Sequence, residues 1–216
     1  MAPDAEKYPA IFIAHAWDGL NDPVKEIAHK VADLGYVAVA VDVYGKGVRG
    51  DPVGDNTHLM APLMEDRKLL NDRLLAAYNK IQGMSFVDEE RMGAIGYCFG
   101  GYCVLDLARA VPDGLKAVVS FHGGLTANNL PSNGPIKTRI LIEHGWDDPI
   151  VPQEDFLAFT KEMDERQADW QAHIHGGAAH AFTFDKADMP DRGIKYHEAA
   201  ARRSWQSMIG FFNEVL

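Results

Sequence analysis

A cysteine flanked by glycines near the middle of the sequence is the first candidate for chemistry. Residues 91–101 read Arg-Met-Gly-Ala-Ile-Gly-Tyr-Cys-Phe-Gly-Gly, which places Cys98 between Gly96 and Gly100. Residues 92–97 have the composition of a strand buried on both faces, and apolar residues recur at helical spacing after Cys98. A strand, a sharp turn and a helix in direct succession are the setting of the nucleophile elbow G-x-S-x-G, here with cysteine in place of serine.

The local sequence favours a reactive thiolate at this turn. The flanking glycines have no Cβ atom, so the strand and the helix can pack closely. The N-terminus of the following helix places backbone N–H dipoles near the sulfur, which favours thiolate over thiol. The alternative is an ordinary buried cysteine, the interpretation we favour for Cys103. Residues at i and i+5 point in different directions, so we expect no disulfide between these two cysteines.

Two later stretches of the sequence provide partners for Cys98. In open α/β sheets, ligands bind at the carboxyl ends of the strands. The pair Asp147-Asp148 follows one predicted strand and His180 follows another, so the order is nucleophile, acid, histidine, as in α/β-hydrolases. A cysteine thiolate would attack a carbonyl carbon, a histidine would take and return the proton, and a carboxylate would fix the histidine tautomer.

The tetrahedral intermediate of such a reaction also needs N–H donors for its oxyanion. The backbone N–H of Phe99, directly after the nucleophile, is the expected first donor. The second should come from the loop after the first strand, near Ala16 or Trp17.

The elements that must position these residues alternate between strands and helices, which predicts a parallel sheet with right-handed crossovers. Asp22 is expected to cap the first helix, with Pro23 at its first position and Gly35 at its end. Residues 45–62 are rich in glycine and contain two prolines, so we expect a loop or partial lid there. Strands are predicted at 10–14, 36–44, 92–97, 115–121, 139–143 and 170–174, and further helices at 64–82, after Cys98, at 156–163 and around 199–212.

These elements form one doubly wound α/β domain over residues 1–216, with a mostly parallel central sheet flanked by helices on both faces. The formal charge of −10 argues against nucleic acid or an anionic membrane as a partner, since both require basic patches. It leaves open a small anionic ligand held by local arginines. There is no signal-peptide pattern and no apolar run of membrane-spanning length, so the default expectation is a cytoplasmic protein. Monomer and homodimer both remain open.

The sequence resembles the dienelactone hydrolase family of α/β-hydrolases along nearly its whole length. The matching segments are 41–45, 96–101, 144–152 and 179–182, and a cysteine in the elbow is typical of this family. The family's acid lies in the pattern Asp-x-x-Val-Pro, which identifies Asp148 rather than Asp147. The resemblance implies a Cys98–His180–Asp148 triad that hydrolyses a small carboxylic ester or lactone through an acyl-thioester intermediate, with no cofactor.

The departures from the family pattern bear on the substrate. The family's founding enzymes carry Gln-Glu after the first strand, and that glutamate pairs with the resting thiol, whereas this chain has His15-Ala16. Cys98 would then rest as an ion pair with His180, or Asp18 or another acid would substitute. Those enzymes also hold a substrate carboxylate with an arginine after the triad histidine, where this chain has residues 182–184, Phe-Thr-Phe. We therefore expect a less anionic or more apolar substrate.

Two other functions remain open on this sequence. A non-hydrolytic binding or regulatory member of the family would keep the fold and lose the esterase chemistry, as the changes at Ala16 and Phe184 would allow. An acyltransferase would use the same site with an acceptor other than water. The candidate substrate-binding residues are His15, Ala16, His122 and Phe182, although His15 could equally cap its loop and His122 is better suited to a structural hydrogen bond.

Several other polar residues have a structural explanation. Asp42, within a predicted buried strand, is expected to anchor loop backbone, because a lone buried carboxylate is costly. Arg67 and Arg73 are expected on a solvated helix face rather than on an anionic substrate. His173 and His175 lie on one side of a predicted strand, but no carboxylate or cysteine nearby in sequence completes a metal site, so we expect none.

Overall fold

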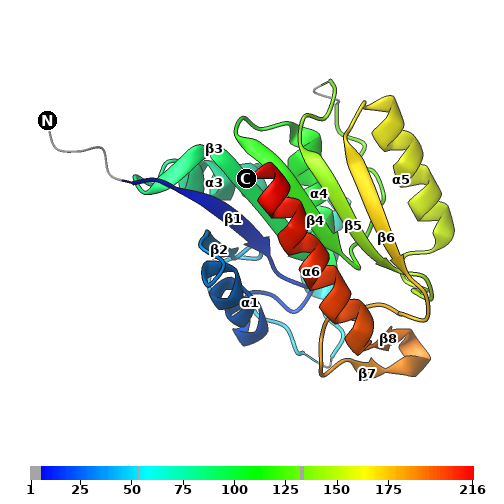
Figure 1. Cartoon of the computed structure of the whole chain (residues 1–216). Helices are drawn as coiled ribbons and strands as arrows, with labels where there is room; N and C mark the ends of the chain where they lie inside the picture. The colour runs from blue at the N-terminus through cyan, green and yellow to red at the C-terminus, as the bar shows by residue number, and fades with distance from the viewer. Residues whose placement is uncertain (1–5, 53, 132–133) are drawn as a thin grey trace, which may run out of the picture.

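The structure is a computed structural model that describes residues 6–52, 54–131 and 134–216. Its centre is a six-stranded sheet in the order β2-β1-β3-β4-β5-β6, and every neighbouring pair is parallel (Figure 1). This confirms the α/β fold class. The strands are β1 (Tyr8–Ala14), β2 (Val37–Val41), β3 (Val87–Tyr97), β4 (Leu115–Phe121), β5 (Arg139–Gly145) and β6 (Trp170–His175).

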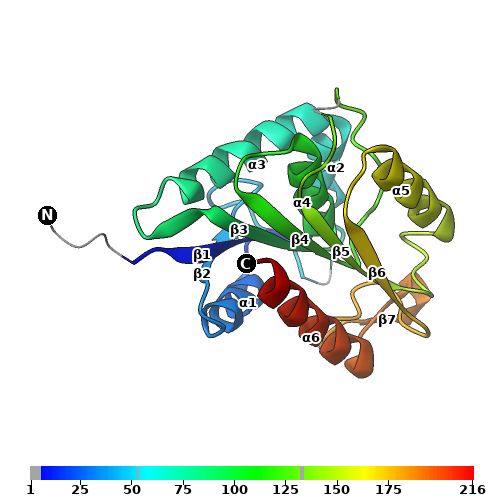
Figure 2. The ribbon, with the colours of Figure 1, turned by 45° about the horizontal axis from the view of Figure 1, so that its top comes forward.

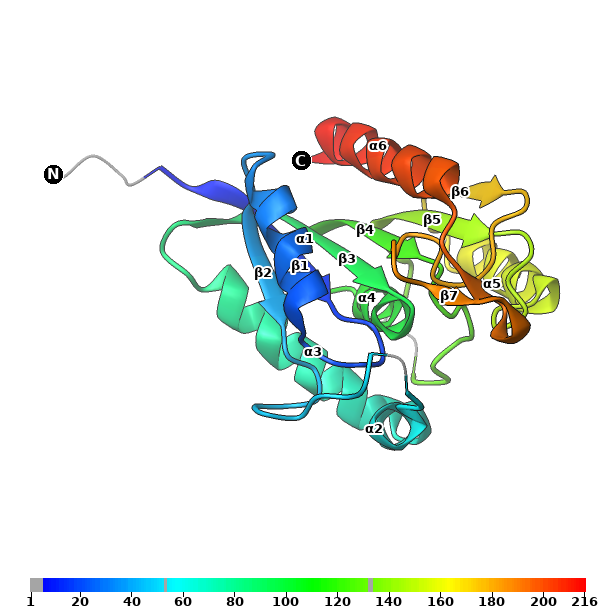
Figure 3. The ribbon, with the colours of Figure 1, turned by 90° about the horizontal axis from the view of Figure 1, so that it is seen from below.

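Helices cover both faces of the sheet (Figures 2 and 3). α1 and α6 lie on one face, and the other four helices lie on the opposite face. No helix in the described part of the chain is both long and apolar enough to cross a membrane. The helices are α1 (Asp22–Ala32), α2 (Thr57–Glu65), α3 (Arg67–Gln82), α4 (Phe99–Ala110), α5 (Gln153–Glu165) and α6 (Glu198–Val215).

The alternation of side chains along each strand divides the core into two layers. On β1, Phe12 points toward the layer of α3 and α4, whereas Ile11 and Ile13 point toward α1 and α6. All three side chains are fully buried, as expected for a central parallel strand covered on both faces. The carboxyl ends of β1, β3, β4 and β5 therefore meet at one rigid edge, and the loops that leave this edge carry the candidate site.

The first helix begins one residue earlier than expected. Asn21, not Asp22, is the N-cap, because its side-chain oxygen accepts a hydrogen bond from the N–H of Val24. The helix ends at Ala32, and Gly35 closes the following turn with φ 97°. Leu34 lies beyond the helix and is 40% exposed.

The single helix expected at 64–82 is in fact two helices that meet at Asp66. Asp66 leaves the helical conformation, with φ −113° and ψ 76°, and its side chain accepts a hydrogen bond from the N–H of Leu69. A side chain that caps the next helix explains the break. The expected loop 45–62 is also shorter, because α2 begins at Thr57 and contains Pro62. Leu69 is 40% exposed and does not share the buried face of α3.

Two smaller differences concern the edges of the fold. β2 is shorter than the expected 36–44 and is only half-buried, because it is an edge strand. A two-stranded antiparallel sheet of β7 (Asp188–Met189) and β8 (Ile194–Lys195), joined by the turn η1 (Pro190–Arg192), was not predicted. Such short strands carry no periodicity that a sequence pattern could reveal.

Candidate active site

Cys98 lies at the turn between β3 and α4, as the elbow pattern predicts. Its backbone is in a left-handed region, with φ 53° and ψ −112°, which is costly for a residue with a side chain. The neighbouring glycines allow this turn. A Cβ atom on Gly96 would lie 1.9 Å from the carbonyl oxygen of Gly100, and one on Gly100 would lie 2.3 Å from that of Ala14. The fold thus holds a partly exposed sulfur at the N-terminus of α4.

His180 lies against this sulfur. Its Nε2 is 3.1 Å from Sγ of Cys98, and its Nδ1 is 2.8 Å from Oδ2 of Asp148. The backbone on either side is fixed by β8, because the N–H of His180 donates to Gly193 and its carbonyl accepts from Lys195. The ring is buried and lies in line between a sulfur and a carboxylate. The loops after β3, β5 and β6 therefore bring together all three predicted residues.

Asp148, and not Asp147, makes this contact. While Oδ2 of Asp148 faces His180, Oδ1 accepts hydrogen bonds from the N–H groups of Ile150 and Val151 at 2.8 and 3.1 Å. The carboxylate is buried and held at both oxygens. Asp147 is exposed.

The charge state of His180 follows from these two neighbours. Burial alone would lower the pKa of His180, but the negative charge and hydrogen bond of the Cys98 thiolate and the bond to Asp148 outweigh it and raise the pKa to about 10. An imidazolium at His180 beside Cys98 is what the ion-pair alternative requires, and that alternative stays a prediction. Asp18, the other alternative, accepts a hydrogen bond from the amide of Asn21, and burial raises the pKa of its carboxyl.

The two expected oxyanion donors lie on the predicted elements. Phe99 is the first residue of α4, where backbone N–H groups have no partner within the helix. Trp17 is half-buried in the loop after β1, and its carbonyl oxygen accepts a hydrogen bond from the hydroxyl of Tyr44 at 2.9 Å. The guanidinium of Arg192 lies 5.9 Å from the centre of the Trp17 ring. Their role as oxyanion donors stays a prediction.

His15 joins two loops below the site. It is fully buried, its Nδ1–H donates to the carbonyl of Ala16 at 2.6 Å, and its Nε2 accepts from the N–H of Val43 at 3.1 Å. Burial lowers the pKa of His15, which agrees with a neutral ring. Both nitrogens are used by backbone, so the structure favours the loop-holding alternative, and Ala16 is half-buried beside it.

His122 and Phe182 lie under the site. Both side chains are fully buried. The Nε2 of His122 is hydrogen-bonded to Oγ1 of Thr183 at 2.7 Å, as the structural interpretation predicted. The Phe182 ring lies between the rings of His122 and His175, with both centroid distances 5.2 Å. In this structure neither side chain reaches the surface that a substrate would contact.

Two predictions about charged residues have opposite outcomes. Asp42 anchors loop backbone as expected, accepting from the N–H of Gly45 at 3.0 Å. The solvated helix face is wrong for Arg67, which is buried. Arg73 is exposed as expected, and its guanidinium also donates to the carbonyl oxygens of Val43 and Tyr44.

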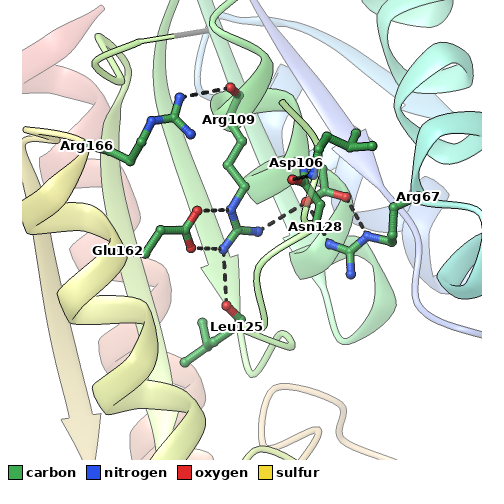
Figure 4. A network of polar contacts seen from close by, with 8 residues as sticks. Arg67, Asp106, Arg109, Leu125, Asn128, Glu162 and Arg166 are labelled. Carbon is green, nitrogen blue, oxygen red and sulfur yellow. Dashed lines mark hydrogen bonds and ion pairs between the residues drawn. The ribbon is translucent and has the colours of Figure 1, made fainter. Parts of the chain in front are cut away.

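Arg67 belongs to a buried ion-pair network on helix α4 (Figure 4). Two of its nitrogens donate to Asp106 at 2.8 and 2.7 Å, and Arg109 donates to the same carboxylate at 3.1 Å. Arg109 also pairs with Glu162 of α5 through two bonds of 2.9 and 2.7 Å. The only signal in the sequence was a pair of charged residues at i and i+3 on an otherwise apolar helix, since the partners lie on α3 and α5.

A second carboxylate that sequence reasoning missed is Glu143, which is fully buried near the end of β5. It accepts from His173 at 3.0 Å and from His175 at 2.7 Å. The two histidines thus share one side of the sheet, as predicted, and pair with a carboxylate from the neighbouring strand. Among the described residues, no group of three histidines, cysteines or carboxylates could hold a metal ion.

A cavity of about 520 Å³ lies on the face of the sheet that α1 and α6 cover, between these two helices. Its walls include Tyr97, Phe184 and Trp205, and Thr183 reaches it from the loop after His180. The triad residues do not line it, so it is separate from the candidate active site.

The fold and the site together define an α/β-hydrolase. The crystal structure of a dienelactone hydrolase-like promiscuous phosphotriesterase from metagenomic libraries has a TM-score of 0.91 at 34% identity, over 99% of this chain and 89% of that one. A second solved structure, m3DLH, has a TM-score of 0.91 at 36% identity, over 100% of this chain and 90% of that one.

The sequence profile of the dienelactone hydrolase family matches residues 1–216, and the chain belongs to this family. An uncharacterized protein of Caenorhabditis elegans is 38% identical over 148 residues, which are 68% of this chain and 94% of that protein. The protein is accordingly a hydrolase of ester or lactone bonds, as predicted.

Proposed function

We propose that the protein is a cysteine-dependent hydrolase of small carboxylic esters or lactones. The observation that carries the proposal is the unbroken line from the Cys98 sulfur through His180 to Asp148, with contacts of 3.1 and 2.8 Å. In this arrangement Cys98 is the nucleophile, His180 transfers the proton, and Asp148 fixes the ring of His180.

The reaction would begin from the thiolate–imidazolium pair. The thiolate attacks the carbonyl carbon, and the developing oxyanion is accepted by the N–H groups of Phe99 and Trp17. When the intermediate collapses, the C–O bond to the leaving group breaks and the imidazolium of His180 gives its proton to the departing alkoxide. The products of this half are an alcohol, a neutral His180 and an acyl thioester on Cys98. In a lactone the alcohol stays attached to the acyl group.

Water completes the cycle. Neutral His180 takes a proton from water while the oxygen attacks the thioester carbonyl, and the C–S bond breaks as the second intermediate collapses. The carboxylic acid leaves, and the thiolate and imidazolium are restored. Asp148 keeps its charge throughout and stabilises the imidazolium each time it forms.

The environment of the site bears on the substrate. Phe184 and Thr183 occupy the place where the founding enzymes of the family hold a substrate carboxylate with an arginine, and Ala16 replaces their glutamate. The Phe184 ring packs on Tyr97 and His122, with centroid distances of 5.9 and 5.8 Å. We infer an ester or lactone that is less anionic or more apolar than dienelactone.

The first test is the pH dependence of iodoacetamide alkylation at Cys98, followed by mass spectrometry in the wild type and in His180→Ala. We expect fast alkylation that persists well below pH 8 in the wild type and is lost in the variant, since the thiolate is the reacting form. Cys103 is fully buried and serves as the internal control thiol. Equally slow alkylation in both proteins would contradict an activated pair.

The second test is turnover of a panel of esters, lactones and one phosphotriester by the wild type and Cys98→Ala. Turnover that survives in Cys98→Ala would refute the proposal. Product formation that accelerates on addition of small alcohols or thiols would identify acyl transfer instead of hydrolysis. An alkylated Cys98 with no turnover on any substrate would favour the binding or regulatory alternative.

A further inference from the structure

His122 touches the triad although the reaction above gives it no role. It follows β4 directly, and its ring centroid lies 5.3 Å from that of His180, with the planes at 68°. The ring is fully buried and thus packs edge to face against the histidine that must face two partners at once. Rings at this distance and angle are in contact.

The second contact of His122 ties down the loop that carries His180. Its Nε2 is hydrogen-bonded to Thr183 Oγ1 at 2.7 Å, three residues after His180. Its backbone N–H donates to the carbonyl of Glu143 at 2.8 Å, so the residue is also anchored to β5. His122 therefore joins the ends of two strands to the loop of the triad histidine.

The backbone at this place is unusual in the same way as at the nucleophile. His122 has φ 39°, Cys98 has φ 53°, and Ala181, next to His180, has φ 56°. Non-glycine residues avoid this region because it is sterically costly, and structures that retain it do so most often at functional sites. Half of the six such residues in the described chain lie in this one group of contacts.

The surroundings of His122 keep its ring uncharged. Burial lowers the pKa of His122 well below its usual range, and the charge of His180 and then that of His144 lower it further. The groups that face it are His180, His144 of β5, Tyr97 of β3 and the rings of Phe182 and Phe184. No described carboxylate or cation is hydrogen-bonded to the ring, whose Nδ1 is buried without a partner. A neutral ring does not repel the imidazolium that His180 becomes.

We propose that His122 is a positioning residue for His180: through its ring contact and its bond to Thr183 it holds the imidazole in line between Cys98 and Asp148. This inference rests on the proposed function, since it assigns His122 a part in the same reaction. His122 does not touch the substrate, and its effect passes through His180 alone.

The test removes the hydrogen bond alone in one variant and removes the ring contact as well in a second. Thr183→Val replaces the hydroxyl by a methyl group of similar size and keeps the loop, while His122→Asn keeps a residue type that tolerates a left-handed backbone. Thr160→Val is the matched control, because the Thr160 hydroxyl donates to the carbonyl of Leu157 on α5, away from the site. The readouts are kcat, KM, the pH profile of kcat/KM, the alkylation rate of Cys98 and the melting temperature.

For Thr183→Val we expect kcat to fall about tenfold with KM within about twofold, because one hydrogen bond that orients the proton carrier is lost while substrate binding is unaffected. The pH profile and the alkylation rate of Cys98 should move with it, and Thr160→Val should leave all of these unchanged. His122→Asn should have the larger effect, since it also removes the ring contact.

A merely structural role would give a different pattern. The melting temperature would fall, while kcat and the pH profile, measured well below it, would stay at wild-type values in both variants. That result would overturn the inference, provided that Cys98→Ala is inactive. If Cys98→Ala retains turnover, the proposed function itself has failed. Should His122→Asn not fold, Thr183→Val decides the question.

Discussion

The two ends of helix α4 lie in two different polar environments. At its N-terminus, the Cys98 sulfur has an imidazole on one side and remains partly exposed on another. In its second half, Asp106 is fully buried and receives three bonds from Arg67 and Arg109. Both environments bring polar groups together over long separations in sequence, but Asp106 is closed off from solvent whereas the sulfur of Cys98 is partly exposed.

The difference shows which buried charges are available for chemistry. In the network around Asp106, each guanidinium and each carboxylate is paired with another fixed group, and Asp106 at its centre is closed off from solvent (Figure 4). At Cys98 the contact with His180 leaves the sulfur partly exposed, and a sulfur beside a single donor keeps lone pairs directed elsewhere. A cluster in which every charged group is paired stabilises the fold, whereas a partly exposed group at a strand end is available to a reactant.

The largest expected effect distinguishes Asp148 of the proposed triad from its sequence neighbour Asp147. Asp148→Asn should lower kcat/KM about ten-thousandfold, because the amide cannot hold the imidazole in the required tautomer. Asp147→Asn is the control, since its side chain is exposed. Steady-state kinetics on the best substrate of the panel measures both. An equal loss in Asp147→Asn would mean that the acid has been misassigned.

In the network the effect should fall on stability and not on turnover. Asp106→Asn removes the carboxylate that Arg67 and Arg109 share and leaves buried Arg67 without a carboxylate partner, so the free energy of unfolding should fall by about 3–5 kcal/mol. Urea denaturation measures the loss, and kcat of the folded variant should stay near the wild-type value. The matched control is Asp72→Asn, which breaks an exposed pair with Lys68. A large loss of kcat in folded Asp106→Asn would show that the two environments are not independent.

A smaller effect is expected in the pH dependence of the stability that His180 contributes. The pKa of His180 rises on folding from 6.5 to about 10, so its stabilising contribution is fully present below pH 6.5 and is lost as the pH rises through about 10. The difference in unfolding free energy between the wild type and His180→Gln should shrink between about pH 7 and about pH 10.5. A constant difference across this range would argue against a charged His180.

The smallest expected effect concerns Glu162, the partly exposed member of the ion-pair network. Glu162 is partly exposed, with 21% of its side chain accessible, and its two bonds go to Arg109 alone. Glu162→Gln should lower the free energy of unfolding by about 1–2 kcal/mol, since water can take over part of the lost contact. A loss as large as that of Asp106→Asn would mean that Glu162 contributes as much to the free energy of unfolding as Asp106.

The parts that the sequence could predict are those fixed by local pattern. The strand at 115–121 was predicted with its observed bounds, because an apolar run between turn signals depends on nothing farther away. The elbow at Cys98 was equally local, and the order of Asp148 and His180 after it supplied the remaining candidates. The strand and the elbow were each predicted from residues within a few positions of one another, whereas Asp148 and His180 were found from their order along the chain and their place after predicted strands.

The parts that escaped prediction depend on partners far along the chain. Arg67 resembles a solvated residue until Asp106, 39 positions later, is placed beside it. Glu143 is a single charged residue in an otherwise apolar strand. Only the pairing of β5 with β6 shows that two histidines are hydrogen-bonded to its carboxylate. The break at Asp66 depended on a choice between continuing one helix and capping the next, which helical periodicity alone does not decide.

The separation of the triad along the chain has a consequence for synthesis. A growing polypeptide presents Cys98 82 residues before His180, and the layer that supports the elbow is closed only by Phe211 and Phe212 of α6. During this interval Cys98 lacks the imidazole that the proposed mechanism assigns to it. The proposed nucleophile therefore meets its proton carrier only after the chain has been made beyond β6, so the proposed reactivity belongs to the finished fold and not to the elbow alone.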